Sequence, residues 1–164
     1  MKIVDRERIL SVQRAAQQSS RLRANDNLHP TLEDPVQRFL NAMEPGTYVR
    51  PHRHAEPGHW ELFLALEGRA AVLVFGDRGE VLGRVEIGPR GPVRAVEVPP
   101  GVWHAVAALE PGTVLFELKP GPYRPLADKD FAPWAPPEGD AGAAELEAWY
   151  RTARPGHRWT AETS

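Results

Sequence analysis

The sequence predicts an all-β domain of antiparallel strands, and three observations support this prediction. Short apolar stretches that are typical of strands follow one another from Val36 to Leu118. Glycine and proline turns separate these stretches at short intervals, which favours a sandwich or barrel over strands that alternate with helices. The chain has 164 residues, of which 41% are hydrophobic and 26% charged, as expected for one globular domain.

A helix is expected before the first strand. Asp5 is a suitable N-cap for a helix that runs to about Gln18. Ile9, Val12 and Ala16 follow at steps of three and four, so they form one apolar stripe. Residues 21–35 are polar and rich in turn formers, so they are predicted to connect the helix to the sheet region.

The strands are then expected in regular succession. Asp77-Arg78-Gly79 is typical of a hairpin turn in the middle of the series. The predicted strands are Val36–Met43, Tyr48–His54, Trp60–Leu66, Arg69–Phe75, Val81–Ile87, Val93–Val98, Trp103–Leu109 and Thr113–Leu118.

The sequence changes character after the last strand. Residues 119–137 hold six prolines together with three aromatic residues. Disordered segments are poor in aromatic residues, so an ordered strap is expected on the barrel or on a second subunit. A short helix over Ala143–Arg151 and a frayed tail over Pro155–Ser164 are expected to follow. The predicted organisation is one domain with an N-terminal segment (1–30), a barrel (31–119) and a C-terminal segment (120–164).

Four residues indicate a metal site. His52 and His54 are two apart, so both side chains point to one face of an extended strand. Glu61 opens the next apolar stretch, and His104 follows the turn Pro99-Pro100-Gly101. Imidazoles and a carboxylate are ligands of borderline divalent metals. The prediction is one divalent ion per chain, and Fe, Mn, Ni and Zn all fit these ligands.

Two neighbouring residues are alternative ligands. Glu56 and His59 lie between His54 and Glu61, and both carry a donor atom suited to a metal. We favour Glu61 because it opens a strand in phase with Phe63 and has six residues between it and Gly68. The alternatives remain open at this point.

These segments resemble the two cupin motifs. The first motif reads Gly46, His52-Arg53-His54, Glu61 and Gly68, and the second reads Pro99-Pro100-Gly101-Val102-Trp103-His104. The spacer before Glu61 is longer than usual, and the second motif lacks its leading glycine and its closing asparagine, where Ala108 stands. The resemblance implies a single cupin, a jelly-roll-like antiparallel β-barrel, here with an N-terminal helix and a short C-terminal helix.

More narrowly, the chain is similar to the WbuC-type cupin metalloproteins from about Ser20 to Gly139. The name associates that family with bacterial surface-polysaccharide gene clusters and implies a metal site, but no defined reaction. The matching stretches are Ser20–Arg23, Asn27–His29, Asp34–Leu40, Glu44–His54, Lys119–Tyr123 and Phe131–Pro136.

Further polar residues are candidates for contact with a substrate. On a regular strand Tyr48 and Arg50 share the inward phase of the two histidines, which makes Tyr48 a candidate proton-transfer group and Arg50 a candidate contact. A second group is expected to fold over the mouth of the barrel and bind an anionic substrate, mainly on the family resemblance: Arg21, Arg23, Asn27 and His29.

Two functions are compatible with these residues. The first is a metal-dependent enzyme, of the isomerase, epimerase, lyase or dioxygenase type, acting on a small sugar-derived or carboxylated molecule. The second is a non-catalytic module in which the metal braces the barrel or helps to hold a small-molecule ligand.

Composition and charge narrow the possible partners, ligands and cellular location of the protein. A net charge of −2 gives no reason to expect nucleic acid or an anionic membrane as partner. The absence of cysteine excludes disulfides and thiolate ligands. No apolar run is long enough to span a bilayer and the first residues are charged, so a cytoplasmic protein is expected. A homodimer is expected because the sheet edges and the apolar strap need cover.

Overall fold

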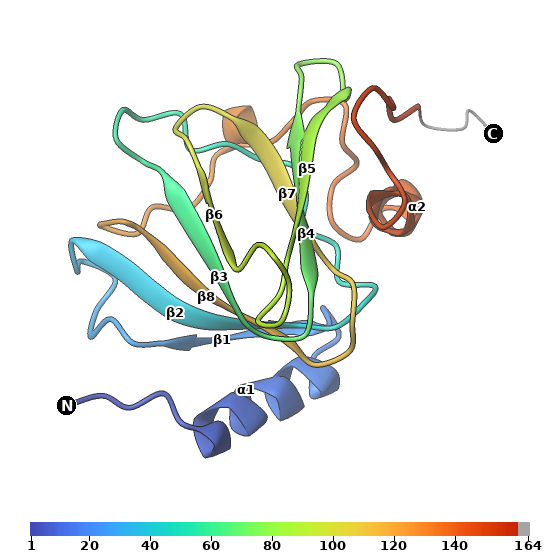
Figure 1. The fold of residues 1–164 in the computed structure, drawn as a ribbon. Coiled ribbons are helices and arrows are strands. Elements are labelled where there is room, and N and C mark those ends of the chain that lie inside the picture. The colour runs from blue at the N-terminus through green and yellow to red at the C-terminus, as the bar shows by residue number, and fades with distance from the viewer. Residues whose placement is uncertain (161–164) are drawn as a thin grey trace.

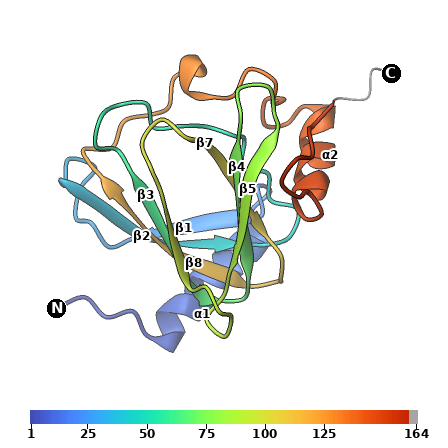
Figure 2. The same ribbon diagram turned by 45° about the horizontal axis from the view of Figure 1, so that its top comes forward.

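The computed structural model describes residues 1–160 as two antiparallel sheets that pack face to face, with one helix against each (Figures 1 and 2). The first sheet has the order β1 (Arg23–Asn27), β2 (Val36–Met43), β8 (Thr113–Pro120), β3 (Glu61–Glu67) and β6 (Ala95–Val98). The second has the order β5 (Val81–Ile87), β4 (Ala70–Phe75) and β7 (Trp103–Ala108). The predicted fold class is confirmed: the chain forms a mostly β antiparallel sandwich with an N-terminal and a C-terminal helix.

The space between the sheets is filled by alternate residues of the strands, because successive side chains of a strand point to opposite faces. On β3 the inward residues are Glu61, Phe63 and Ala65, and the residues between them are less buried. The apolar core between the sheets consists of Met43, Phe63, Ala65, Ala70, Val72, Ile87, Val98, Val106, Ala108 and Leu115.

Helix α1 (Arg6–Gln18) lies against the outer face of the first sheet (Figure 1). The Asp5 side chain accepts a hydrogen bond from the Arg8 backbone N–H at 2.9 Å, as expected for an N-cap. Val12 and Ala16 are buried against Leu40 and its neighbours. The helix therefore forms where the apolar stripe predicts it.

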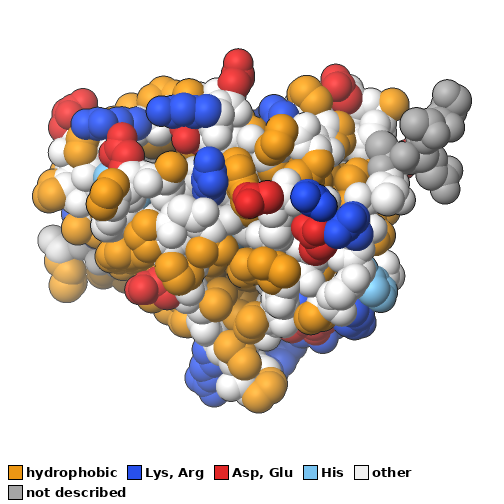
Figure 3. Space-filling model, turned by 90° about the horizontal axis from the view of Figure 1, so that it is seen from above, with side chains coloured by type: hydrophobic (Ala, Val, Ile, Leu, Met, Phe, Trp, Pro, Cys, Tyr) orange, Lys and Arg blue, Asp and Glu red, His pale blue; other side chains and the backbone are white. Residues whose placement is uncertain are grey.

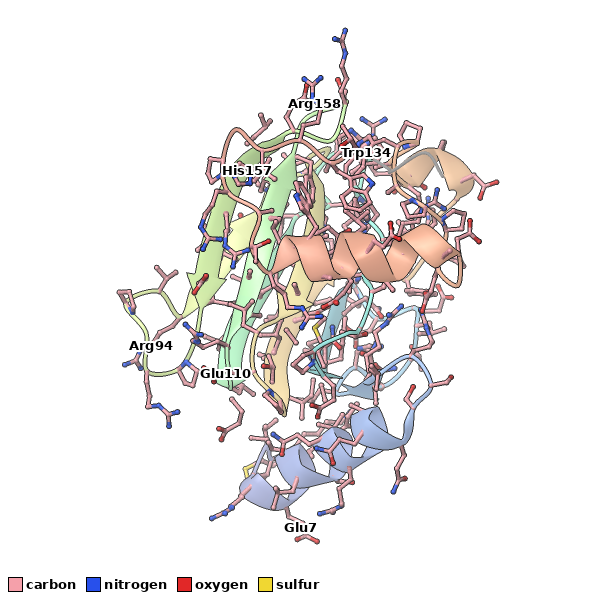
Figure 4. The ribbon with its side chains drawn as sticks, turned by 90° about the vertical axis from the view of Figure 1, so that its right-hand side faces the viewer. Glu7, Arg94, Glu110, Trp134, His157 and Arg158 are labelled. Atoms are coloured by element: carbon pink, nitrogen blue, oxygen red, sulfur yellow. The ribbon has the colours of Figure 1, made fainter. Side chains whose placement is uncertain are left out.

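Helix α2 (Ala141–Tyr150) lies across the outer face of the second sheet (Figure 4). Leu146 and Tyr150 are fully buried in a cluster that also holds Phe75 and the strap residues Ala132 and Ala135. A stretch of the strap thus packs on the barrel of its own chain. Of the described residues, no helix is both long and apolar enough to cross a membrane.

The tail is packed where fraying was predicted. Trp159 packs against the cluster beneath α2, and the Arg158 side chain pairs with Glu80 of the β4–β5 hairpin, near the labelled Trp134 and His157 in Figure 4. The prediction of a frayed tail is therefore wrong for residues 155–160. The last four residues of the predicted tail, 161–164, lie outside the described residues.

Two further expectations differ from the structure. Arg23–Asn27, predicted as part of a connection, forms the edge strand β1, which pairs with β2 through its backbone. Its polar sequence carries no apolar alternation that predicts a strand. Tyr48–His54, predicted as a strand, forms only isolated bridges at His52, and Pro51 just before it has no N–H for a ladder.

Candidate metal centre

The segment that carries His52 and His54 is tied to the start of β7. The His52 N–H donates to His104 O at 3.0 Å, and the His104 N–H donates to His52 O at 2.9 Å. The Gly101 N–H donates to His54 O at 2.8 Å. These three hydrogen bonds join the two motifs of the sequence and place both histidine side chains beside His104.

Glu61 brings a carboxylate to the same point from the other sheet. It is the first residue of β3, and only 2% of its surface is exposed. Its Oε2 lies 3.1 Å from His54 Nε2, 3.0 Å from His104 Nε2 and 3.9 Å from His52 Nε2. One donor atom from each of the four residues lies within 4.8 Å of all the others.

The imidazoles of His52 and His104 are oriented by backbone carbonyls. His52 Nδ1 lies 3.0 Å from Arg50 O, and His104 Nδ1 lies 2.9 Å from Val102 O. A carbonyl only accepts, so each Nδ1 donates and each Nε2 remains as a metal ligand. Burial, followed by the neighbouring His104, lowers the pKa of His52 to about 3. Neutral imidazole is the form that binds a metal.

Lys119 on β8 holds the other oxygen of Glu61. Its Nζ lies 2.9 Å from Glu61 Oε1. Burial alone would raise the pKa of Glu61, but the charge of Lys119, followed by the neighbouring histidines, holds it well below its usual value. Burial likewise opposes the charge of Lys119, but the carboxylates of Glu61 and Glu117 raise its pKa. The pair is therefore ionised, and Oε2 is the oxygen presented to the imidazoles.

A second carboxylate, Glu117, lies one inward position further along β8. Its register partners are Phe39 on β2 and Phe63 on β3, and it is 5% exposed. The Asn41 side-chain amide donates to Glu117 Oε1. Burial, and then the charge of Glu61, raise the pKa of Glu117 to about 7.

A cavity of about 670 Å³ opens beside these residues. His52, His54 and Lys119 line it, and part of the strap, residues 120–127, forms one side. Small-molecule sites have volumes of about 300–1,000 Å³. Figure 3, which looks down on the molecule from above, shows basic and acidic side chains interspersed among apolar ones on the upper face of the molecule.

The donor set fits a divalent metal. Three imidazole nitrogens and one carboxylate oxygen converge, and two of the imidazoles already carry the hydrogen bonds typical of metal-bound histidine. Iron, manganese or nickel with five or six ligands would keep positions open for a further molecule, whereas tetrahedral zinc would be closed by the same four residues.

The two alternative ligands lie outside this cluster. Glu56 is exposed and pairs with Arg124 at 3.0 Å, and His59 Nδ1 lies 3.6 Å from Glu56 Oε2. Glu61 is the carboxylate that the structure brings to the three histidines. The longer spacer between His54 and Glu61 is accommodated as a surface loop around Glu56.

Tyr48 does not lie with the four ligand residues. Its hydroxyl donates to Pro136 O at 2.8 Å, and its ring stacks on Tyr150 beneath α2, on the outer face of the second sheet. Burial raises its pKa. The inward phase expected for Tyr48 required a regular strand, and the chain between Tyr48 and Pro51 forms none.

The expected substrate contacts are also placed elsewhere, since none of them lines the cavity. Arg21 and Arg23 both pair with Glu138, at 2.7 Å and 3.0 Å. The others are engaged or exposed: His29 Nδ1 contacts the backbone of Arg38, Asn27 is exposed at the end of β1, and the Arg50 Nε–H donates to Ala135 O.

Sequence reasoning missed Lys119 and Glu117 as site residues. Both follow the inward alternation of β8 from Leu115, so a signal existed: charged residues at two successive inward positions of a buried strand. A charge at such a position has to be paired or functional. The apolar residues that alternate with them, Phe116 and Leu118, hid this pattern.

Comparisons with known proteins identify a sequence family for the chain and solved structures to which it is similar. No protein of curated function matches the chain. The solved structure of TT1209 from Thermus thermophilus is 21% identical, with a TM-score of 0.51, over 73% of this chain and 97% of that one. KdgF from Halomonas sp. is 19% identical, with a TM-score of 0.48, over 62% and 80%. A cupin superfamily protein from Desulfitobacterium hafniense is 18% identical, with a TM-score of 0.46, over 60% and 76%.

At these identities the likeness to solved structures concerns the fold alone. A family model described as "Domain of unknown function (DUF6016)" matches residues 4–87, which is just over half of the chain. The matched region includes His52, His54 and Glu61 and ends before His104. The chain belongs to the DUF6016 family.

Proposed function

We propose that this protein is a metal-dependent enzyme that acts on a small sugar-derived or carboxylated molecule bound in the cavity. The observation that carries the proposal is the convergence of four ligand atoms within 4.8 Å beside a cavity of about 670 Å³. A metal bound there would polarise a substrate oxygen as a Lewis acid.

The chain's own residues would prepare the site for this chemistry. The backbone carbonyls of Arg50 and Val102 orient two imidazoles before a metal binds. Lys119 fixes Glu61 in its ionised form. The strap shields one side of the cavity from water. The supported reaction classes are isomerase, epimerase, lyase and dioxygenase, which share the need for an oxygen activated by a metal.

The test begins with metal analysis of protein purified without an affinity tag. We expect one divalent ion per chain. Cobalt-substituted protein should then change its visible spectrum on addition of azide, because an open coordination position accepts the anion. A thermal-shift screen with sugars, nucleotide sugars and small carboxylates would identify the substrate class. Protein that takes up no stoichiometric metal would contradict the proposal.

A non-catalytic metal module is the second candidate. The four residues join both sheets and the segment after Pro51, so a fully coordinated ion would brace the sandwich. In that case chelation would lower the melting temperature and azide would leave the cobalt spectrum unchanged. The azide response therefore separates the two candidates.

The biological setting is a further proposal. The stretches shared with WbuC-type cupins support a role in bacterial surface-polysaccharide metabolism in the cytoplasm, with no nucleic-acid or membrane partner. We also propose a homodimer, because strands β1 and β6 end the first sheet and leave edges to cover. Light scattering at micromolar concentration tests the dimer, and a monomer would contradict it.

A further inference from the structure

We propose that the molecule held in the cavity is an anion, specifically a small carboxylate, and that Lys119 selects it. This inference rests on the proposed function, because it needs a metal at the four ligand residues. It assigns a role to a residue that the sequence motifs do not include.

The first support is the position of the Lys119 ammonium group. Lys119 lines the cavity, and its Nζ lies 2.9 Å from Glu61 Oε1 and 5.5 Å from the ring centroid of Phe39. An ammonium group has three N–H donors. Within residues 1–160 no second acceptor lies at hydrogen-bond distance from Nζ. Two donors thus remain for a molecule in the cavity.

The second support is the charge at the base of the cavity. A divalent ion with three neutral imidazoles and the Glu61 carboxylate carries one net positive charge, and Lys119 adds another. An ionised Glu117 would offset only one of these two charges, so at least one net positive charge remains at the base of the cavity. Charges in a site shielded from water interact more strongly than charges in bulk solvent. An anionic ligand would neutralise this excess.

The third support is that the acidic side chains of the cavity wall are already engaged. Glu56 pairs with Arg124 at 3.0 Å. Asp130 Oδ2 accepts a hydrogen bond from the Ala127 N–H at 3.0 Å. Arg124 balances the charge of Glu56, and among the described residues neither of these two carboxylates forms an ion pair with Lys119. A carboxylate ligand is an acceptor at both oxygens, so it matches the donors of Lys119 and an open metal position.

The test compares glycolate with glycolamide, which are similar in size and differ in charge. Binding to the cobalt-loaded protein is followed by the visible spectrum. We expect glycolate to bind the wild type at least about tenfold more tightly than glycolamide does. A difference of this size corresponds to the free energy of one charge-assisted hydrogen bond. Equal affinity in a protein that binds cobalt and azide normally would overturn this inference and leave the proposed function standing.

Variants assign the preference to Lys119. Lys119→Gln keeps an N–H donor and removes the charge, so the preference for glycolate should fall about tenfold, whereas Lys119→Arg should retain it. Lys2→Gln makes the same change in net charge on the exposed N-terminal segment and is the matched control. An unchanged preference in Lys119→Gln, with cobalt and azide binding intact, would overturn the role of Lys119.

A direct measurement covers the case in which Lys119→Gln loses its metal. The chain has three lysines, Lys2, Lys119 and Lys129, so the ammonium signals of protein labelled with ¹⁵N at lysine Nζ are few and can be assigned by single Lys→Arg variants. In cadmium-loaded wild type, glycolate should shift the Lys119 signal and leave that of Lys2 in place. A Lys119 signal that glycolate leaves unchanged would overturn the inference. Absence of metal binding or of an azide response in the wild type would overturn the proposed function as well.

Discussion

The two ends of the space between the sheets differ sharply although the same strands build both. Along β3 the inward residues run from Glu61 to Ala65, and along β8 they run from Lys119 to Leu115. On β7, His104 begins a series that continues with two apolar residues. Each strand is therefore polar at the cavity end and apolar at the closed end.

This difference separates two tasks within one core. Burial of apolar surface at the closed end stabilises the sandwich by about 25 cal/mol per Å². At the cavity end, buried charges and imidazoles cost solvation free energy, which their mutual contacts and a bound metal offset. Substitutions at the closed end should thus lower the stability of the fold and leave metal binding intact. Substitutions of the ligand residues at the cavity end should weaken metal binding and change the stability of the fold less.

The largest effect is expected at the cavity end. His52→Ala combined with His104→Ala removes two of four ligands and should weaken metal binding by roughly 5 kcal/mol, more than a thousandfold. Metal analysis after dialysis measures this loss. His59→Ala is the matched control and should keep one ion per chain. Retention of stoichiometric metal in the double variant would reject the site.

At the closed end, Leu115→Ala should lower the free energy of unfolding by about 2–5 kcal/mol, because Leu115 is fully buried and the cavity left behind is filled only in part. Urea denaturation measures this change. Metal content should stay at one ion per chain, and Leu82→Ala, at a position that is 65% exposed, should change stability by less than about 0.5 kcal/mol. Loss of metal from Leu115→Ala would show that the two ends are coupled.

Glu117 lies between the two ends, and its effect depends on pH. Its pKa in the folded protein is about 7, above the usual 4.5, so the folded state holds this proton more tightly than the unfolded state. The stability that protonation contributes is fully present below pH 4.5 and is lost as the pH rises through 7. Glu117→Gln should therefore stabilise the chelator-treated protein at pH 8 by on the order of 3 kcal/mol and have little effect at pH 4.

Urea titrations at both pH values measure the effect of Glu117→Gln. Glu56→Gln, at an exposed and paired position, should show no comparable dependence. A Glu117→Gln protein that is less stable than the wild type at pH 8 would contradict the buried position assigned to this carboxyl.

The smallest effect is expected outside both ends. Tyr48→Phe removes one hydroxyl, which donates to Pro136 O beneath α2, so it should cost about 1 kcal/mol of stability. Its metal content and azide response should match those of the wild type. A changed azide response in Tyr48→Phe would restore the role that strand phase predicts for this residue.

Much of the fold follows from local patterns. The strand Val81–Ile87 is predicted to the residue, and Asp5 caps α1 as expected, because alternation and capping are local in the chain. β1 was not predicted, since an edge strand such as Arg23–Asn27 is defined by pairing with β2 rather than by its own side chains. The packing of Trp159 against the cluster beneath α2 likewise depends on a contact between distant segments.

The candidate metal centre likewise has one part that the sequence predicts and another that only the tertiary structure shows. Residue type and spacing in the sequence identify His52, His54, Glu61 and His104 as a set, because few side chains bind a divalent metal and these occur at ends of expected strands. Only the folded chain excludes Glu56, places Tyr48 beneath α2 and brings Lys119 to Glu61. These outcomes depend on where loops turn and on which strands become neighbours, and long-range packing decides both.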